Sequence, residues 1–282
     1  MNGERCVAFQ GEPGAYSEET ALEYFNQPVT TLPCHAFEDV FSAVSSGRAT
    51  HGVLPIENSL AGSIHRNYDL LLRNDLQIIG EYHYRVSHCL LAKPGIDLSE
   101  LRTVHSHPQA LAQCETSLAR MGLEPVVEAD TAGSARWLHE SGGRSDGAIA
   151  SQRAAQVYNL SILARNLEDN PANYTRFLIL ANNSPEEVNA LEADHYKTSI
   201  VFSMPNRPGI LFKAMSVFAL RDIDLTKIES RPIPGKPWEY MFYIDFAGYV
   251  RAPVCERALA HLEELTVFLR ILGSYPRHRL EY

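Results

Sequence analysis

The chain has 282 residues, 45% of them hydrophobic and 21% charged, with a formal net charge of −9 at pH 7. These are ordinary globular values that exclude extensive disorder, and the length suffices for one large domain or two. The acidic balance argues against a nucleic-acid or anionic-membrane surface, because both need a basic footprint. Since no apolar run approaches the about 20 residues that span a bilayer, we expect neither nucleic acid nor a membrane as a partner.

The cysteines and the start of the chain favour a cytoplasmic location. The five cysteines are scattered without a C-x-x-C pair, which fits structural thiols better than disulfides or zinc ligands. The opening MNGERCVAF has neither a long apolar core nor a cleavage pattern typical of a signal peptide.

Short β-like runs alternate with helical patterns through the first 180 residues. The predicted strands are residues 4–9, 51–56, 76–86, 87–92, 102–106, 125–129, 146–151, 160–164 and 175–181. The predicted helices lie within residues 11–25 (capped by Ser17), 37–47, 62–72, 108–122, 131–141 and 151–159. This alternation is typical of an α/β fold with helix-covered sheets. The consecutive strands at 76–92 interrupt the rhythm, which favours two lobes over a single sheet.

A second domain follows a polar segment. Its predicted order is strand 197–205, helix 208–222, strands 224–233 and 238–248, helix 253–266 and strand 267–276. This βαββαβ order is the ferredoxin-like split βαβ motif. We therefore predict a two-lobed domain at residues 1–184, a linker at 185–196 and a ferredoxin-like domain at 197–282.

Four polar stretches adjoin the predicted strands of the first domain, where open α/β sheets bind ligands. The first is VLPIENSLAGSIH, in which Glu57, Asn58 and Ser59 follow a strand and Gly62 allows close backbone approach. An ordinary helix cap with polar turn residues explains the same pattern.

The second stretch, VHSHPQALAQC, places Ser106 after a strand and Gln113 on the following helix. The amides of that helix start suit an anion. His105 and His107 invite a metal interpretation, but no third ligand has suitable spacing, so we expect hydrogen-bonding histidines and no metal. The third stretch, EADTAGSARW, offers Thr131 as a helix cap.

The fourth stretch, NPANYTRFLIL, places Thr175 and Arg176 beside Phe177 at the start of an apolar run. Such a run suggests a strand buried on both faces. A buried arginine needs an anionic ligand or an internal ion pair, and both interpretations stay open.

Together, GEPGAYSEETA, VLPIENSLAG, SHPQALAQC and NYTRFLIL resemble the prephenate dehydratase family, in the family's order over residues 4–182. The segment KTSIVF…PGILFKAMSVFALRDIDLTKIESRP is similar to its amino-acid-sensing ACT domain. The resemblance implies two lobes like those of periplasmic binding proteins, with the active site between them. It implies a carbon–oxygen lyase that converts prephenate to phenylpyruvate without a cofactor, and no chorismate mutase segment.

The resemblance also implies roles for residues. Thr175 is the leading catalytic residue, and Glu57, Asn58, Ser106 and Gln113 support it. The residues expected to bind substrate are Arg176, Ser59, Gly62, Thr131 and Phe177. Since a threonine hydroxyl is a very weak acid, we hypothesise that Thr175 donates a polarised hydrogen bond while a buried, protonated Glu57 supplies the proton.

In this family, phenylalanine binds between paired ACT domains, so a homodimer or homotetramer with feedback inhibition is implied. The matching positions are Gly209, Ile210, Leu211, Glu229, Ser230, Arg231 and Pro232. Ile210 departs from the family's Gly-Ala-Leu pattern, and its bulk is expected to narrow the pocket. A cross-strand pair between Glu229 and Arg231 is the structural alternative.

Two other functions compete with this interpretation. Arogenate dehydratases perform the same chemistry on the aminated substrate, and TAGSAR and LTKIESRP are similar to members that prefer arogenate. A non-catalytic amino-acid sensor is the alternative from another class. Such a sensor would need no proton-donating network around Thr175.

Overall fold

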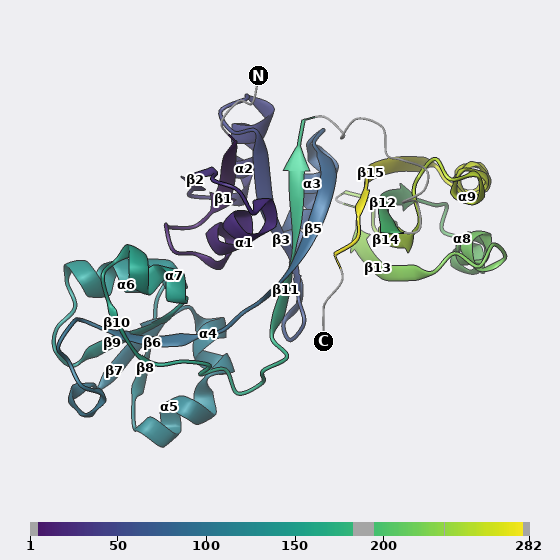
Figure 1. Ribbon diagram of the computed structural model, residues 1–282. Coiled ribbons are helices and arrows are strands. Elements are labelled where there is room, and N and C mark those ends of the chain that lie inside the picture. The colour runs from purple at the N-terminus through teal and green to yellow at the C-terminus, as the bar shows by residue number, and fades with distance from the viewer. Residues whose placement is uncertain (1–4, 183–194, 234, 279–282) are drawn as a thin grey trace. The chain divides into compact units, whose positions relative to one another are not determined.

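The computed structural model describes residues 5–182, 195–233 and 235–278 (Figure 1). All but the last two residues of the predicted linker at 185–196 lie outside this part of the chain. The chain forms two compact units, residues 1–64 with 82–177 and residues 65–81 with 178–282.

The helices are α1 (Tyr16–Phe25), α2 (Phe37–Ser45), α3 (His65–Arg73), α4 (Pro108–Gln113), α5 (Glu115–Met121), α6 (Thr131–Glu140), α7 (Gln152–Val157), α8 (Ile210–Ala219) and α9 (Pro253–Leu265), with the short 3-10 turn η1 (Leu98–Glu100). The strands are β1 (Cys6–Gln10), β2 (Thr30–Cys34), β3 (His51–Asn58), β4 (Gly62–Ser63), β5 (Gln77–Arg85), β6 (Cys89–Ala92), β7 (Thr103–Ser106), β8 (Glu124–Val127), β9 (Asp146–Ala150), β10 (Ser161–Ala164), β11 (Tyr174–Ala181), β12 (Tyr196–Ser203), β13 (Leu225–Pro232), β14 (Tyr240–Ala247) and β15 (Phe268–Pro276).

The strands from β1 to β11 form two sheets. Lobe 1 is built on the sheet β2-β1-β3-β11-β5, and lobe 2 is built on β10-β6-β9-β7-β8. Lobe 2 is covered on both faces. Leu90 packs with α4 and α5, whereas its neighbour Leu91 packs with α6 and α7. Strands buried on both faces read as continuous apolar runs, which is why CLLA and DGAIA show no alternation.

The second unit contains the ferredoxin-like domain, whose sheet order is β13-β14-β12-β15. Side chains of β12 and β14 alternate between its two faces. Ile200, Phe202 and Ile244 face α8 and α9 in a continuous core. On the opposite face, Tyr243 donates a hydrogen bond to the Tyr68 carbonyl of α3. Two α/β lobes and a βαββαβ domain confirm the predicted fold class.

Local corrections concern helix starts. Ala15, not Ser17, is the N-cap residue of α1, and Asp130, not Thr131, caps α6 by accepting from the Gly133 amide at 2.6 Å. The helix predicted at 108–122 is divided at Cys114.

Strand β2 was not predicted, because TTLPC contains a proline and most of its residues are not buried. In the described residues, no helix has the length and apolar character needed to cross a membrane.

Candidate active site

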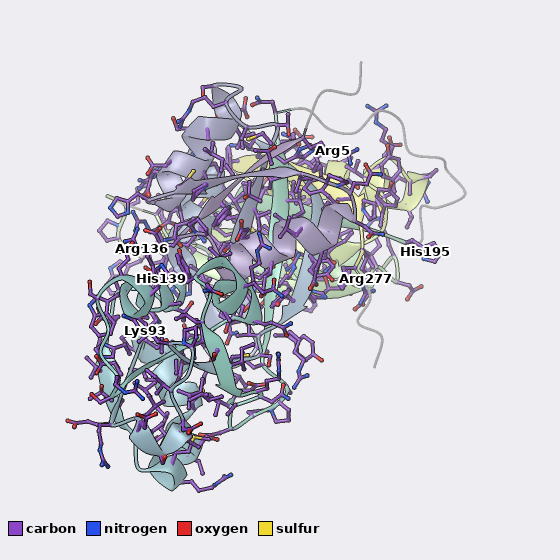
Figure 2. The ribbon with its side chains drawn as sticks, turned by 60° about the vertical axis from the view of Figure 1, so that its left-hand side comes forward. Arg5, Lys93, Arg136, His139, His195 and Arg277 are labelled. Atoms are coloured by element: carbon purple, nitrogen blue, oxygen red, sulfur yellow. The ribbon has the colours of Figure 1, made fainter. Side chains whose placement is uncertain are left out.

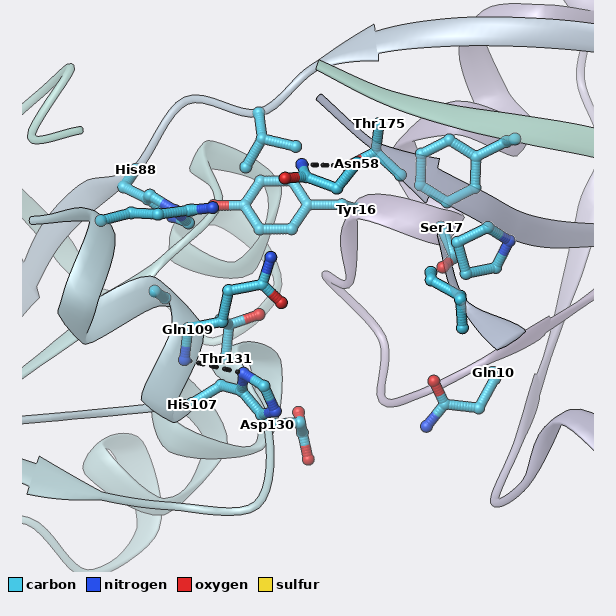
Figure 3. Close-up of a pocket in the computed structure, with 16 residues that line it drawn as sticks. Gln10, Tyr16, Ser17, Asn58, His88, His107, Gln109, Asp130, Thr131 and Thr175 are labelled. Atoms are coloured by element: carbon cyan, nitrogen blue, oxygen red, sulfur yellow. Dashed lines mark hydrogen bonds between the residues drawn. The ribbon is translucent and has the colours of Figure 1, made fainter. Parts of the chain in front are cut away.

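A cavity of about 250 Å³ opens between the two lobes of the first unit (Figure 3). This volume is near the lower end of the range for small-molecule sites. Its wall is formed by Gln10, Tyr16, Ser17, Pro55, Asn58, Ile64, Val86, His88, His107, Gln109, Ala110, Gln113, Asp130, Thr131, Thr175 and Phe177.

The Asn58 amide is held in one orientation at the end of β3. Its Oδ1 accepts hydrogen bonds from the backbone amides of Leu60 and Ala61, both at 3.0 Å. The Nδ2 group must therefore point the other way, where it donates to Thr175 Oγ1 at 3.0 Å and Asn173 Oδ1 at 2.8 Å. Because the Thr175 oxygen accepts from Asn58, the Thr175 proton is left to donate to a molecule in the cavity.

The hydrogen bonds that begin at Asn58 continue from lobe 1 into lobe 2. Asn173 donates through Nδ2 to Gln113 Oε1 at 2.9 Å. The same Gln113 oxygen lies 2.9 Å from His88 Nε2, and His88 Nδ1 lies 2.7 Å from the Tyr16 hydroxyl. A single network of hydrogen bonds thus joins Thr175 to Tyr16.

The hydrogen bonds of this network determine the protonation states of its members. An amide oxygen accepts only, so His88 carries its proton on Nε2 and its Nδ1 accepts from Tyr16. Burial lowers the pKa of His88, which keeps the imidazole neutral. Burial, with the Glu19 charge adding to it, raises the pKa of Tyr16 well above its ordinary value. Neither group is therefore a strong acid at neutral pH, and both act as fixed hydrogen-bonding partners.

This protonation has a consequence for stability. In the unfolded chain His88 titrates near its ordinary pKa of about 6.5, so at lower pH the unfolded state binds more protons than the folded state. Its stabilising contribution is present above that pH and is lost as pH falls through the lowered folded pKa. We expect the thermal midpoint to fall more between about pH 7.5 and about pH 5.5 in the wild type than in His88→Gln. Equal falls in both proteins would contradict a buried, neutral His88.

Close contacts between the lobes shape the cavity. Ser151 donates to the Gly14 carbonyl at 2.7 Å, and Arg136 of α6, which is labelled in Figure 2, pairs with Glu12 at 3.0 Å. Gly14 has φ +90°, and a Cβ there would come within 2.6 Å of Ala154 Cα. Only glycine lets the loop before α1 approach α7 so closely, and this loop leads directly to Tyr16.

The side chains that line the cavity carry little formal charge. Among the residues described, no lysine or arginine lines it, and Asp130 is its one carboxylate. The remaining polar wall consists of amides, hydroxyls and two histidines. Pro55, Ile64, Val86 and Phe177 supply an apolar portion.

The structure brings together half of the predicted substrate-site residues. Thr175, Asn58, Gln113, Thr131 and Phe177 line the cavity. Glu57, Ser106, Ser59, Gly62 and Arg176 do not. The hypothesis that Glu57 is a proton donor in a buried pocket is not supported, because Glu57 is half-buried opposite Ser63 of β4 and outside the cavity wall.

Three of the absent residues have structural positions instead. Ser106 is fully buried and donates to the Ile149 carbonyl at 2.7 Å, which ties β7 to β9. Ser59 donates to the Ala172 carbonyl and accepts from the Tyr174 amide, which fixes the start of β11. Arg176 is 8% exposed and lies between two cavity-lining residues of a strand, so alternation turns it to the other face.

Sequence reasoning missed three members of the network, Tyr16, His88 and Asn173. Tyr16 is within the quoted stretch GEPGAYS, and Asn173 adjoins Thr175, so a polar side chain near a recognised motif was an available signal. His88 gave no signal, because SHCLLA reads as an ordinary buried strand. His105, by contrast, pairs with Glu128 at 3.0 Å and stacks on Trp137. Within the described residues, no cluster of His, Cys, Asp and Glu is suited to a metal.

The predicted regulatory residues separate onto two faces of the ferredoxin-like sheet. Gly209 begins α8 with φ +77°. Glu229 and Arg231 lie on the other face, where Glu229 is 3.3 Å from His65 and Arg231 is 3.0 Å from Asp69 of α3. The Asp69 carboxylate raises the pKa of Arg231. These partners replace the cross-strand pair considered from sequence, and one chain alone does not bring the regulatory residues into a single cluster.

The comparisons with known proteins agree with this architecture. The prephenate dehydratase family model matches residues 7–185, and the ACT domain model matches residues 198–254. The chain is 48% identical to the chloroplastic arogenate dehydratase/prephenate dehydratase 2 of Arabidopsis thaliana, over 98% of this chain and 74% of that protein.

Two solved structures are similar over nearly the whole chain. One is described as GqqA, a novel type of quorum quenching acylase, with 40% identity, a TM-score of 0.91 and coverage of 97% of this chain and 98% of that one. Another is prephenate dehydratase from Arthrobacter aurescens in complex with L-Phe, with 30% identity, a TM-score of 0.86 and coverage of 96% and 90%. With the family model covering more than half of its length, the chain belongs to the prephenate dehydratase family and carries a C-terminal ACT domain.

Proposed function

We propose that this dehydratase converts prephenate to phenylpyruvate, carbon dioxide and water at the cavity between the lobes. The observation that carries the proposal is the Asn58–Thr175 hydrogen bond of 3.0 Å on the cavity wall. It leaves one hydroxyl proton directed by a rigid network, in a site partly lined by apolar side chains.

The chemistry needs a polarised donor more than a strong acid. The bond between the ring and its carboxylate breaks, its electron pair enters the ring, and the bond to the opposite hydroxyl breaks. Carbon dioxide and hydroxide leave, and the hydroxide takes a proton from the solvent to become water. Formation of the aromatic ring drives the step, so the protein's task is to stabilise charge on the departing oxygen.

Thr175 can stabilise the departing oxygen, and the apolar wall can accept the ring carboxylate. A hydrogen bond from Thr175 stabilises the developing hydroxide, and Asn58 polarises that hydroxyl. Next to Pro55, Ile64, Val86 and Phe177 a ring carboxylate would be poorly solvated, which favours loss of neutral carbon dioxide.

Arogenate, the aminated form, is the second candidate substrate. Curated relatives at 48% and 49% identity carry both activities in their names. The cavity observation that favours arogenate is its wall, which has one carboxylate and, over the described residues, no cationic side chain. Arogenate bears an ammonium and matches this wall better than prephenate, which carries two carboxylates and no cation.

Purified protein incubated with prephenate tests the reaction. Phenylpyruvate absorbs strongly in alkali, so we expect absorbance to accumulate in proportion to enzyme and time. A parallel incubation with arogenate, followed by chromatography for phenylalanine, gives kcat/KM for both substrates. No aromatic product from either substrate at high enzyme concentration would refute the dehydratase and favour a binding role.

We further propose that L-phenylalanine inhibits the enzyme by binding between paired ACT domains of a dimer or tetramer. Gly209→Val is expected to abolish this inhibition and retain most activity. A Cβ at Gly209 meets nothing within 4 Å, so the effect arises from φ +77°, which a β-branched residue resists.

Gly235 is the matched control. It has the same φ of +77° and the same open surroundings, but lies in the hairpin after β13. Gly235→Val should keep phenylalanine inhibition, measured as the concentration that halves the rate. Wild-type inhibition in Gly209→Val would place the regulatory site elsewhere.

A further inference from the structure

Four polar side chains on the wall of the cavity lie apart from Thr175. We call them the head-group cluster; they are His107, Gln109, Asp130 and Thr131. In Figure 3 Thr175 lies at the top of the view, and His107, Thr131 and Asp130 lie well below it, beyond Tyr16 and Asn58. A molecule that places its leaving hydroxyl at Thr175 therefore extends its opposite end toward this cluster.

The cluster offers donors for one carboxylate. His107 Nδ1 accepts from the Gln109 backbone amide at 3.2 Å, so its Nε2 carries the proton and can donate. The Gln109 amide and the Thr131 hydroxyl add further donors, and the structure gives neither side chain a partner within the described residues. These are neutral groups, which bind a carboxylate without reversing the local charge.

Asp130 adds an acceptor of a different kind. One oxygen, Oδ1, is committed to the Gly133 amide at the start of α6, at 2.6 Å. The second oxygen, Oδ2, has no hydrogen-bond donor in the parts of the chain that the structure describes. No cationic side chain of these parts lines the cavity beside it. The carboxylate is thus held in place by the helix start, with one oxygen left for a ligand.

A carboxylate acceptor beside neutral carboxylate donors is complementary to an amino-acid head group. The ammonium satisfies Asp130, and the α-carboxylate satisfies His107, Gln109 and Thr131. An α-keto acid instead presents a carbonyl oxygen at the ammonium position, where it faces the Asp130 charge without a proton between them.

We propose that the head-group cluster selects a substrate bearing an α-ammonium group, and that Asp130 is the residue that discriminates arogenate from prephenate. This inference rests on the proposed dehydratase reaction. It assigns arogenate, the aminated substrate, as the preferred substrate of the same site.

Asp130→Asn tests the proposal with little change to the fold, because asparagine caps a helix as well as aspartate does. We expect kcat/KM for arogenate to fall about 10- to 100-fold, as for loss of a charge-assisted hydrogen bond. The kcat/KM for prephenate should stay the same or rise. The ratio of the two constants is the readout, since a merely structural role for Asp130 would lower both alike.

Asp169→Asn is the matched control. Asp169 also accepts backbone amides near a helix start, from Thr116 at 2.9 Å and Ser117 at 3.3 Å, but does not line the cavity. Its substitution should leave the ratio unchanged. A wild type that prefers prephenate, or an Asp130→Asn ratio within about twofold of wild type, would overturn the proposal.

Binding separates failure of this inference from failure of the reaction. Arogenate is titrated calorimetrically into Thr175→Val and into the same variant with Asp130→Asn. Weaker binding in the double variant supports the cluster even where the wild type turns over neither substrate, which would refute only the dehydratase. Equal binding would refute the cluster.

Discussion

Thr175→Val is expected to lower kcat by about 10²- to 10³-fold with little change in thermal midpoint. Valine keeps the shape of threonine but cannot donate to the departing hydroxide. Asn58 keeps two other acceptors, Asn173 Oδ1 and the Tyr174 carbonyl, so the network around it survives. The measurement is kcat with either substrate, alongside a thermal melt.

Thr175→Ser is the matched control for this loss. Serine restores the hydroxyl without the methyl group, so we expect it to stay within about tenfold of wild type. The direction of the hydroxyl is the property under test, since Asn58 fixes the oxygen at 3.0 Å. A valine variant that is as active as the serine variant would show that the hydroxyl does not take part in the reaction.

Lys197→Met is expected to lower the free energy of unfolding by about 3–5 kcal/mol. Lys197 Nζ lies 2.7 Å from Glu81 Oε2 within the second unit, and the two side chains are 6% and 0% exposed. Removing the lysine takes away the cation beside the buried Glu81 carboxylate. This lowers the free energy of unfolding far more than the loss of an exposed ion pair does. Chemical denaturation of the full chain, followed by circular dichroism, measures the change.

A double variant and an exposed pair complete this test. Lys197→Met combined with Glu81→Leu should recover most of the loss, because no uncompensated charge remains. Arg144→Met, which breaks a largely exposed ion pair with Glu100, should give no measurable change. A single Lys197→Met variant as stable as Arg144→Met would contradict a desolvated pair.

The arrangement of the fold was predictable because hydrophobic periodicity decides it. Continuous apolar runs such as CLLA gave buried strands, and the βαββαβ order gave the ferredoxin-like domain. Helix starts were less predictable. Thr131 and Asp130 are both good caps, and only the backbone geometry shows that Asp130 accepts from Gly133.

Site membership was harder to predict than the fold, because a strand presents neighbouring residues to opposite faces. Thr175 and Phe177 line the cavity, whereas Arg176 between them does not. A motif in sequence includes both faces alike. Likewise, Ser106 adjoins the cavity-lining His107 in sequence, yet its hydroxyl is spent on the Ile149 carbonyl. His88 joined the site only through contacts with Tyr16 and Gln113, residues 72 and 25 positions away.

We expect Thr175 and its network to carry out decarboxylation and loss of hydroxide in the cavity between the lobes. Substrate labelled in its ring carboxylate measures this most directly, as labelled carbon dioxide trapped per aromatic product formed. We expect one carbon dioxide per product from wild type, and a parallel fall of carbon dioxide and product in Thr175→Val. Aromatic product without labelled carbon dioxide, or undiminished release in Thr175→Val, would contradict it.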